Sequence, residues 1–303
     1  MAHNHNIHNH KPNNLDGITR AFYLGIGLNV VYTVIEFMAG YYYDSLALLA
    51  DASHNLSDIV SLIISLVGLK LGQKAATKLF TYRYRKTSIL ASFINSVLLI
   101  AIAGYILFKA FERLNNVHIV GGKAIIIVAL IGVAINSLSA YLFYKDQKHD
   151  INIKGAFLHL LVDALVSVGV VISGVIIYYT DWFIVDTIIS FFIAIIILIA
   201  TWNLFKTSLR LILDGIPEGI DYKDITTCIL ETDGVLNTHH LHIWGLSSTE
   251  NALSAHITCP KDLSMEETRK ITTNLKHKLQ HKNIHHISLE FECENDECLD
   301  HNC

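Results

Sequence analysis

The chain has 303 residues, of which 52% are hydrophobic and 17% are charged, and its formal net charge is −4 at pH 7. Soluble domains carry roughly 25% charged residues, so this composition favours a membrane protein. The slight acidic excess argues against nucleic-acid binding, which usually uses a basic surface.

The chain begins with a histidine-rich segment, MAHNHNIHNH, which contains His3, His5, His8 and His10. Such tracts are typical of metal binding, and this one lacks the basic and apolar regions of a signal peptide. We therefore expect residues 1–19 to be a cytoplasmic tail that captures metal, and the five cysteines to be reduced thiols. Incidental metal binding by this tail is the alternative.

Six apolar stretches follow, and each is long enough to cross a hydrocarbon core of ~30 Å, which takes about 20 helical residues. They lie near residues 20–42, 46–70, 89–113, 119–144, 155–179 and 183–206. Polar residues such as Asn29, Glu36 and Asn95 within these stretches should face one another or a wet cavity rather than lipid. Residues 20–208 are therefore predicted to form an all-α, six-helix transmembrane domain in the lipid bilayer.

Lysine and arginine are concentrated in two of the predicted connections, at Lys70, Lys74, Lys78, Arg83, Arg85 and Lys86, and at Lys145, Lys148 and Lys154. The one–two turn YYYDS and the five–six turn YYTDW contain neither residue type. Because basic loops stay in the cytoplasm, this pattern predicts that both termini are cytoplasmic.

Two histidines lie well inside the predicted spans, and each is followed four residues later by an aspartate: His54 by Asp58, and His159 by Asp163. Residues four apart share one face of a helix, and ionisable groups at membrane depth are usually functional. Two facing helices would present two imidazoles and two carboxylates, a ligand set that suits tetrahedral Zn²⁺. An interhelical hydrogen bond is the alternative for each pair. Asp51 shares this face, as a residue that orients the ligands, as part of the exit path, or as a hydrated residue near the outer end of the span.

The chain becomes polar after the last span, and residues 209–292 show mixed periodicity. We predict a helix in 222–234, strands in 235–244 and 252–259, a helix in 264–280 that opens with a capping box, and a strand in 284–292. The order αββαβ predicts a small α+β domain with its helices on one side of a sheet.

The last segment, residues 293–303, combines thiols with one imidazole at Cys293, Cys298, His301 and Cys303. These are good zinc ligands, so we predict a Cys/His-rich tail that captures or senses zinc. Incidental binding is again the alternative.

The segments SLALLADASHNLSD, ASFIN, HLLVDALVS and LILDGIP together resemble the cation diffusion facilitator family. The resemblance implies divalent-metal transporters that work as proton antiporters and homodimers, with six spans and a ferredoxin-like cytoplasmic domain, in a bacterial inner or plasma membrane. It places the transport site at His54, Asp58, His159 and Asp163, and histidine at the first of these positions implies a preference for zinc over cadmium.

The resemblance also implies a regulatory metal site in the cytoplasmic domain, at His239, His256, Glu290 and Glu292. Strict strand alternation conflicts with this assignment, because it places His239 on the same side as Leu241 and Ile243. A solvated sheet face is the alternative. A Lys86–Asp214 ion pair is implied as well.

The function predicted from these features is export of divalent cations, most specifically Zn²⁺, in exchange for protons, with further zinc bound for regulation. Protons and metal compete for the same imidazole and carboxylate atoms, which gives the exchange a physical basis. The alternatives are a membrane-bound metal sensor and an intramembrane metalloenzyme. The enzyme is disfavoured because the sequence has no HExxH motif and because four protein ligands leave no position for an activated water.

Overall fold

The computed structural model describes residues 15–73, 75–116, 118–144 and 151–294. Six long helices come first: α1 (Leu15–Tyr42), α2 (Leu46–Gln73), α3 (Thr87–Asn115), α4 (Gly122–Phe143), α5 (Ile151–Thr180) and α6 (Ile184–Ile212). Each coincides with one predicted apolar stretch. Within the described residues, α3, α4, α5 and α6 are long and apolar enough to cross a membrane. Membrane spans at α1 and α2 stay predictions.

The chain forms two compact units. The first draws on residues up to Ile59 and on Ala101–Ile197, and the second on Val60–Ile100 and the chain from Leu198 onwards. In the first unit α4 packs along α5, and α1 packs against α4. The α4–α5 contact is close at two glycines: a Cβ on Gly122 would lie 2.9 Å from the backbone nitrogen of Tyr178, and one on Gly174 would lie 3.0 Å from that of Ile126. Small residues allow membrane helices to approach in this way.

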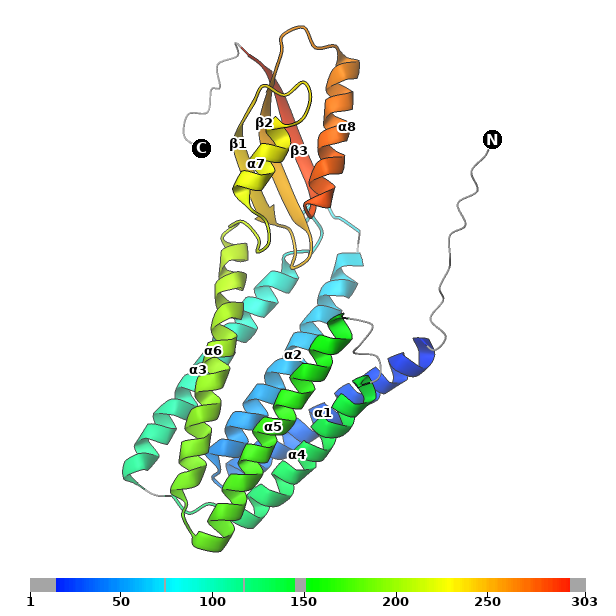
Figure 1. Cartoon of the computed structure of the whole chain (residues 1–303). Helices are drawn as coiled ribbons and strands as arrows, with labels where there is room; N and C mark the ends of the chain where they lie inside the picture. Colours follow the sequence, from blue (N-terminus) through cyan, green and yellow to red (C-terminus); the bar gives the residue numbers. More distant parts are fainter. Residues whose placement is uncertain (1–14, 74, 117, 145–150, 295–303) are drawn as a thin grey trace. The chain divides into compact units, whose positions relative to one another are not determined.

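The helices of the second unit's small domain lie on one face of its sheet (Figure 1). Its elements are α7 (Tyr222–Leu230), β1 (Asn237–Gly245), β2 (Asn251–Cys259), α8 (Met265–His281) and β3 (Ile284–Cys293), so the predicted order αββαβ is confirmed. The strand order is β1-β2-β3, with β1 antiparallel and β3 parallel to β2. The predicted capping box is present at the start of α8, where Ser264 and Glu267 bond reciprocally.

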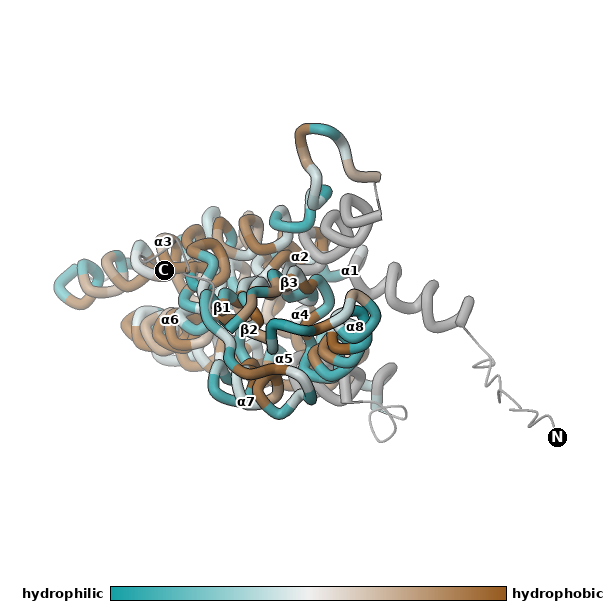
Figure 2. The backbone as a smooth tube through the Cα atoms, turned by 90° about the horizontal axis from the view of Figure 1, so that it is seen from above, coloured by the Kyte–Doolittle hydropathy of each residue, from teal (hydrophilic) through white to brown (hydrophobic). Residues whose placement is uncertain are grey.

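Hydropathy distinguishes the long helices from the small domain (Figure 2). Brown, apolar residues follow α3 and α6 along much of their length, whereas α8 carries teal, polar residues on the side away from the sheet. The inner side of α8 contributes Ile271, Leu275 and Leu279 to a core that also contains Leu253 and Ile257 of β2. Burial of these side chains holds the domain together, at roughly 1.5–3 kcal/mol for each fully buried aliphatic residue. The opposite face of the sheet is left free for polar residues.

Candidate functional site

One of the predicted ligand contacts joins two helices of the first unit. The Nε2 atom of His54 on α2 lies 3.1 Å from Oδ1 of Asp163 on α5, and Asp163 is only 2% exposed. One helical turn away, the Ser167 hydroxyl of α5 donates to Oδ2 of Asp51 on α2 at 2.9 Å. Two polar contacts therefore fix the spacing of α2 and α5 at the depth of the predicted transport site.

The other two predicted ligands, Asp58 and His159, lie on the backbone of α2 and α5, but their side chains are outside the part of the chain that the structure describes. The tail histidines His3, His5, His8 and His10 are outside the described residues as well. The four-ligand constellation therefore stays a prediction.

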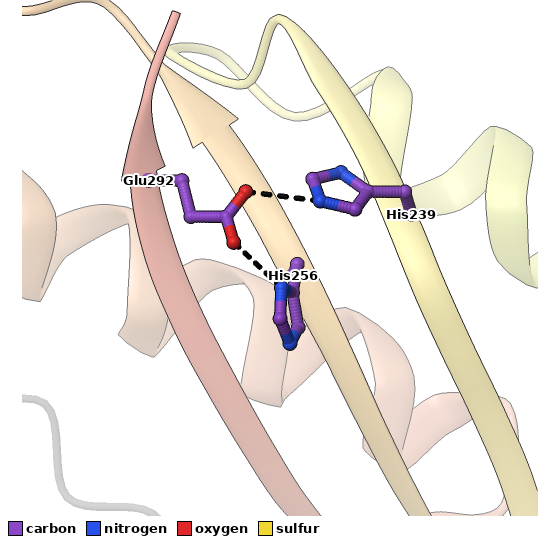
Figure 3. A group of neighbouring side chains, drawn as sticks. All are labelled: His239, His256 and Glu292. Carbon is purple, nitrogen blue, oxygen red and sulfur yellow. Dashed lines mark hydrogen bonds and ion pairs between the residues drawn. The ribbon is translucent and has the colours of Figure 1, made fainter. Parts of the chain in front are cut away.

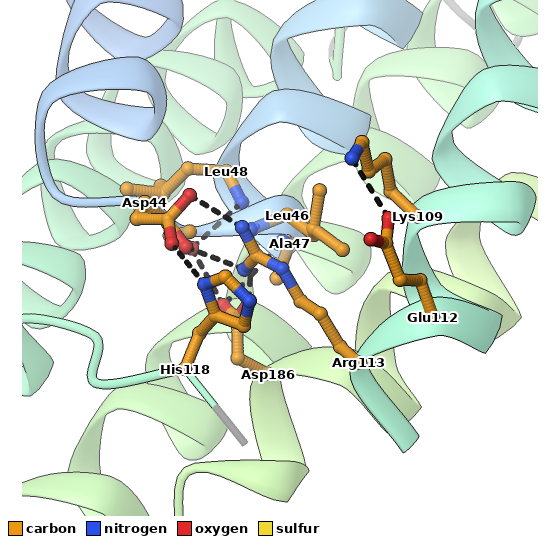
Figure 4. A network of polar contacts seen from close by, with 10 residues as sticks. Asp44, Leu46, Ala47, Leu48, Lys109, Glu112, Arg113, His118 and Asp186 are labelled. Carbon is orange, nitrogen blue, oxygen red and sulfur yellow. Dashed lines mark hydrogen bonds and ion pairs between the residues drawn. The ribbon is translucent and has the colours of Figure 1, made fainter. Parts of the chain in front are cut away.

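A buried carboxylate that the sequence did not single out caps the helix that carries His54 (Figure 4). Asp186, in the first turn of α6 and 1% exposed, accepts the Ser45 hydroxyl at 2.6 Å and the backbone N–H groups of Leu46 at 2.8 Å and Ala47 at 3.4 Å. The first N–H groups of a helix have no partner within the helix and carry partial positive charge. An acidic residue in the first turn of a helix usually stabilises the N-terminus of that same helix. Asp186 lies in the first turn of α6 but stabilises the N-terminus of α2 instead.

The same end of the first unit holds a second charge group around the turn between α1 and α2 (Figure 4). Arg113 of α3, 7% exposed, donates to the backbone oxygen of Asp44 at 2.6 Å and forms an ion pair with its carboxylate. His118 Nδ1 lies 2.9 Å from the other carboxylate oxygen. These contacts tie the ends of α1, α2 and α3 together.

The polar face of the small domain brings together three of its predicted ligands (Figure 3). His239 Nε2 lies 2.9 Å from Glu292 Oε2, and His256 Nδ1 lies 2.6 Å from Glu292 Oε1. One possible ligand atom from each residue lies within 4.8 Å of the others. His239 Nε2 is buried and, although close to Glu292, makes no hydrogen bond. Two imidazoles, one of which has a ring nitrogen without a hydrogen bond, and one carboxylate together suit Zn²⁺ as ligands.

A β-bulge in β1 removes the conflict between strict strand alternation and the predicted role of His239. His239 pairs with His256 and His242 pairs with Ser254, so three steps on β1 oppose two on β2. His240 has a left-handed backbone with φ 48°. The extra residue changes the parity of the strand, so His239 joins the polar face while Leu241 and Ile243 are buried.

The fourth predicted ligand of this group, Glu290, lies apart from the other three. Its carboxylate is 3.5 Å from His256 Nε2, whereas Glu292 lies against Nδ1, and its side chain is 71% exposed. Since the two glutamates approach different ring nitrogens of His256, they do not converge on one point.

The predicted tail ligand Cys293 is the last residue of β3 and pairs in register with Cys259 of β2. Burial, together with the neighbouring Cys293, raises the pKa of the Cys259 thiol. Cys298, His301 and Cys303 lie outside the described residues. In the second unit, the Lys86 ammonium lies 2.6 Å from Asp214 Oδ1, so these two side chains form the expected ion pair.

Apolar helices of membrane-spanning length, a buried histidine–aspartate contact between two of the long helices and a sheet face with metal-ligand chemistry define a metal-handling integral membrane protein. Residues 22–213 match the family described as "Cation efflux transmembrane domain", and residues 217–292 match "Cation efflux protein, cytoplasmic domain". The chain belongs to the cation diffusion facilitator family.

Three relatives illustrate the relationship. The chain is 36% identical to the "Cadmium, cobalt and zinc/H(+)-K(+) antiporter" of Bacillus subtilis, over 97% of this chain and 93% of that protein. It is 33% identical to the "Metal cation efflux system protein CzcD" of Cupriavidus metallidurans, over 96% and 93%. It is 32% identical to the "Zinc transporter ZitB" of Pectobacterium atrosepticum, over 99% and 93%. The protein is therefore a divalent metal cation efflux transporter and not an enzyme.

Proposed function

We propose that this protein exports divalent cations, most specifically Zn²⁺, from the cytoplasm in exchange for protons, through an intramembrane site of His54, Asp58, His159 and Asp163. The contact between His54 on α2 and Asp163 on α5 carries the proposal, because it joins one member of each ligand pair across two helices. Zinc is the cargo here: its charge offsets the carboxylates, and its preference for tetrahedral nitrogen and oxygen ligands matches the set.

Exchange with protons follows from the chemistry of the ligands. Imidazole binds metal when it is neutral and carboxylate when it is ionised, so protons and Zn²⁺ exclude one another at the same atoms. A relative with H(+)-K(+) in its name supports an antiport mechanism in this family. The basic connections support an orientation with both termini in the cytoplasm, where metal is collected.

The domain organisation belongs to the same proposal. Residues 1–19 form a tail, 20–208 a six-span transport domain, 209–292 a ferredoxin-like metal-binding and dimerisation domain, and 293–303 a second tail. The αββαβ order supports the ferredoxin-like assignment. His239, His256 and Glu292 hold a regulatory zinc ion, and two copies of the chain assemble as a homodimer.

Zinc flux in sealed proteoliposomes tests the transport function. With a zinc-sensitive dye inside and purified full-length protein in the membrane, we expect zinc entry that rises when the lumen is acidic. Zinc binding without flux would favour a membrane-bound sensor, and flux that ignores the proton gradient would leave a facilitator rather than a proton antiporter.

His54→Asp is expected to lower the zinc-to-cadmium transport ratio by about tenfold, which corresponds to about 1.4 kcal/mol. The change keeps a ligand but replaces a single nitrogen with a carboxylate, which can bind through one or two oxygens and so accepts a larger ion. Parallel zinc and cadmium flux measurements provide the ratio. His118→Asn, at a histidine outside the site, is the control, and an unchanged ratio in His54→Asp would remove His54 from the selectivity argument.

His239→Ala is expected to weaken zinc binding at the small domain by at least about 100-fold, since even the loss of an outer partner of a metal ligand costs 10–100-fold. The measurement is a chelator competition titration of the full-length protein, in an Asp163→Ala background that removes the proposed transport site. His242→Ala, on the same strand but outside the cluster, is the matched control. Equal effects of the two changes would contradict the assignment.

A further inference from the structure

A second polar cluster lies between α1 and α2, beside the His54–Asp163 contact. Glu36 of α1 and Asp51 and Asn55 of α2 are each at most 1% exposed. The Tyr32 hydroxyl donates to Glu36 Oε1 at 2.7 Å, and the Asn55 amide donates to Glu36 Oε2 at 3.0 Å. Both oxygens of Glu36 are thus held in place by neutral donors.

Asp51 faces this group with an oxygen that accepts nothing. Its Oδ2 accepts the Ser167 hydroxyl, but its Oδ1 is buried without a hydrogen-bond partner, and so is Oδ1 of Asn55. Asp51 and Asn55 are four residues apart on α2 and so share one face of the helix, and the Asn55 amide on that face bonds Glu36. The carboxyl groups of Asp51 and Glu36 therefore influence each other electrostatically. Glu36, Asp51 and Asn55 therefore form a buried cluster in which two side-chain oxygens, Asp51 Oδ1 and Asn55 Oδ1, have no hydrogen-bond donor.

This arrangement is short of one positive charge. Two adjacent carboxylates repel each other, and burial makes the repulsion costly. Among the residues that the structure describes, the titratable groups with the largest effects on the pair are Tyr32, His54 and Asp163, and none of these has the fixed positive charge of a lysine or an arginine. A proton between the carboxyl groups, or a hard cation bound by their oxygens, would supply the charge.

We propose that Glu36, Asp51 and Asn55 form the counter-cation site of the transporter, where one monovalent cation is held between the two carboxyl groups. The inference rests on the proposed transport function and adds a site that is separate from the metal ligands. Asp51 precedes His54 by three residues on α2, and its partner Ser167 follows Asp163 by four on α5. Filling or emptying the site changes the net charge of the Glu36–Asp51 pair, and the Asp51–Ser167 contact transmits that change to the spacing of α2 and α5.

Infrared difference spectroscopy of the full-length protein in detergent tests the site without transport. If the ion is a proton, the wild type shows a carboxylic-acid C=O band that is lost in Glu36→Gln but kept in Glu112→Gln, a control at an exposed glutamate on α3. If the ion is potassium, a KCl titration at constant pH shifts a carboxylate band that the same variant loses. The absence of both signals would overturn the proposal.

Proteoliposome flux then tests coupling. The quantity measured is the ratio of zinc flux with and without an opposed gradient, either of protons or of potassium at equal pH. We expect one of these gradients to stimulate the wild type, and the ratio to fall to about one in Glu36→Gln and in Asp51→Asn. Wild-type stimulation in both variants would refute the counter-cation site, whereas a wild type without zinc flux would refute the proposed function instead.

Discussion

Asp163→Ala is expected to reduce zinc flux by at least about 100-fold while leaving a folded, membrane-inserted protein, since the loss of an outer partner of a metal ligand alone costs up to about 100-fold. The change removes one carboxylate of the proposed site, whose Oδ1 lies 3.1 Å from His54 Nε2. Since the new side chain is small and apolar, it suits the buried contact between α2 and α5. Zinc entry into dye-loaded vesicles gives the flux, and size-exclusion chromatography reports folding.

The control for this variant is Asp181→Asn, at an exposed aspartate in the turn between α5 and α6. Asp181 has φ 51°, a left-handed conformation that asparagine adopts readily. We expect wild-type flux from the control. Undiminished zinc flux in Asp163→Ala, by contrast, would contradict the assignment of the transport site.

Asp186→Ala is expected to lower the free energy of unfolding by about 1–3 kcal/mol, the usual cost of leaving buried donors without their acceptor. The change takes away the acceptor for the Ser45 hydroxyl and for the first N–H groups of α2. These donors are buried, so no water replaces the lost carboxylate. Denaturant unfolding in detergent micelles, followed by circular dichroism, measures the difference.

Glu112→Ala is the matched control, because it too removes a carboxylate that takes part in polar contacts. Figure 4 shows both side chains. Glu112 pairs with Lys109 at 2.8 Å, but its side chain is 49% exposed, and exposed ion pairs contribute about 0–1 kcal/mol. A loss of similar size in the two variants would show that Asp186 acts as an ordinary surface charge and does not cap α2.

The sequence was a good guide wherever the signal is local. Apolar stretches predicted the six long helices, and Ser264 with Glu267 correctly located the start of α8. The four-residue spacing within each pair, His54 with Asp58 and His159 with Asp163, predicted that the two helices face each other with these side chains. The contact between His54 and Asp163 is consistent with that prediction.

Contacts between distant residues could not be predicted in this way. Asp186 and Ser45 are 141 positions apart, and Asp51 and Ser167 are 116 apart. Nothing in the pattern around Asp186 indicates that it serves a different helix. The side of the sheet on which His239 lies could not be predicted from strand alternation, because alternation assumes one residue for each residue of the partner strand, and the bulge at His240 breaks that assumption. The pattern of the strand does not indicate which of the consecutive residues His239 and His240 lies on the polar face of the sheet.

The bulge in β1 also affects how the small domains behave when many copies are crowded together. β1 and β3 are the two edges of the sheet, and an exposed edge can recruit a strand from another molecule. On β1 the left-handed residue His240 interrupts the regular spacing of N–H and C=O groups, and β3 carries the exposed charge of Glu290. Neither edge offers a flat, neutral template. The irregularity that turns His239 toward its metal-ligand partners thus also protects the domain against edge-to-edge aggregation.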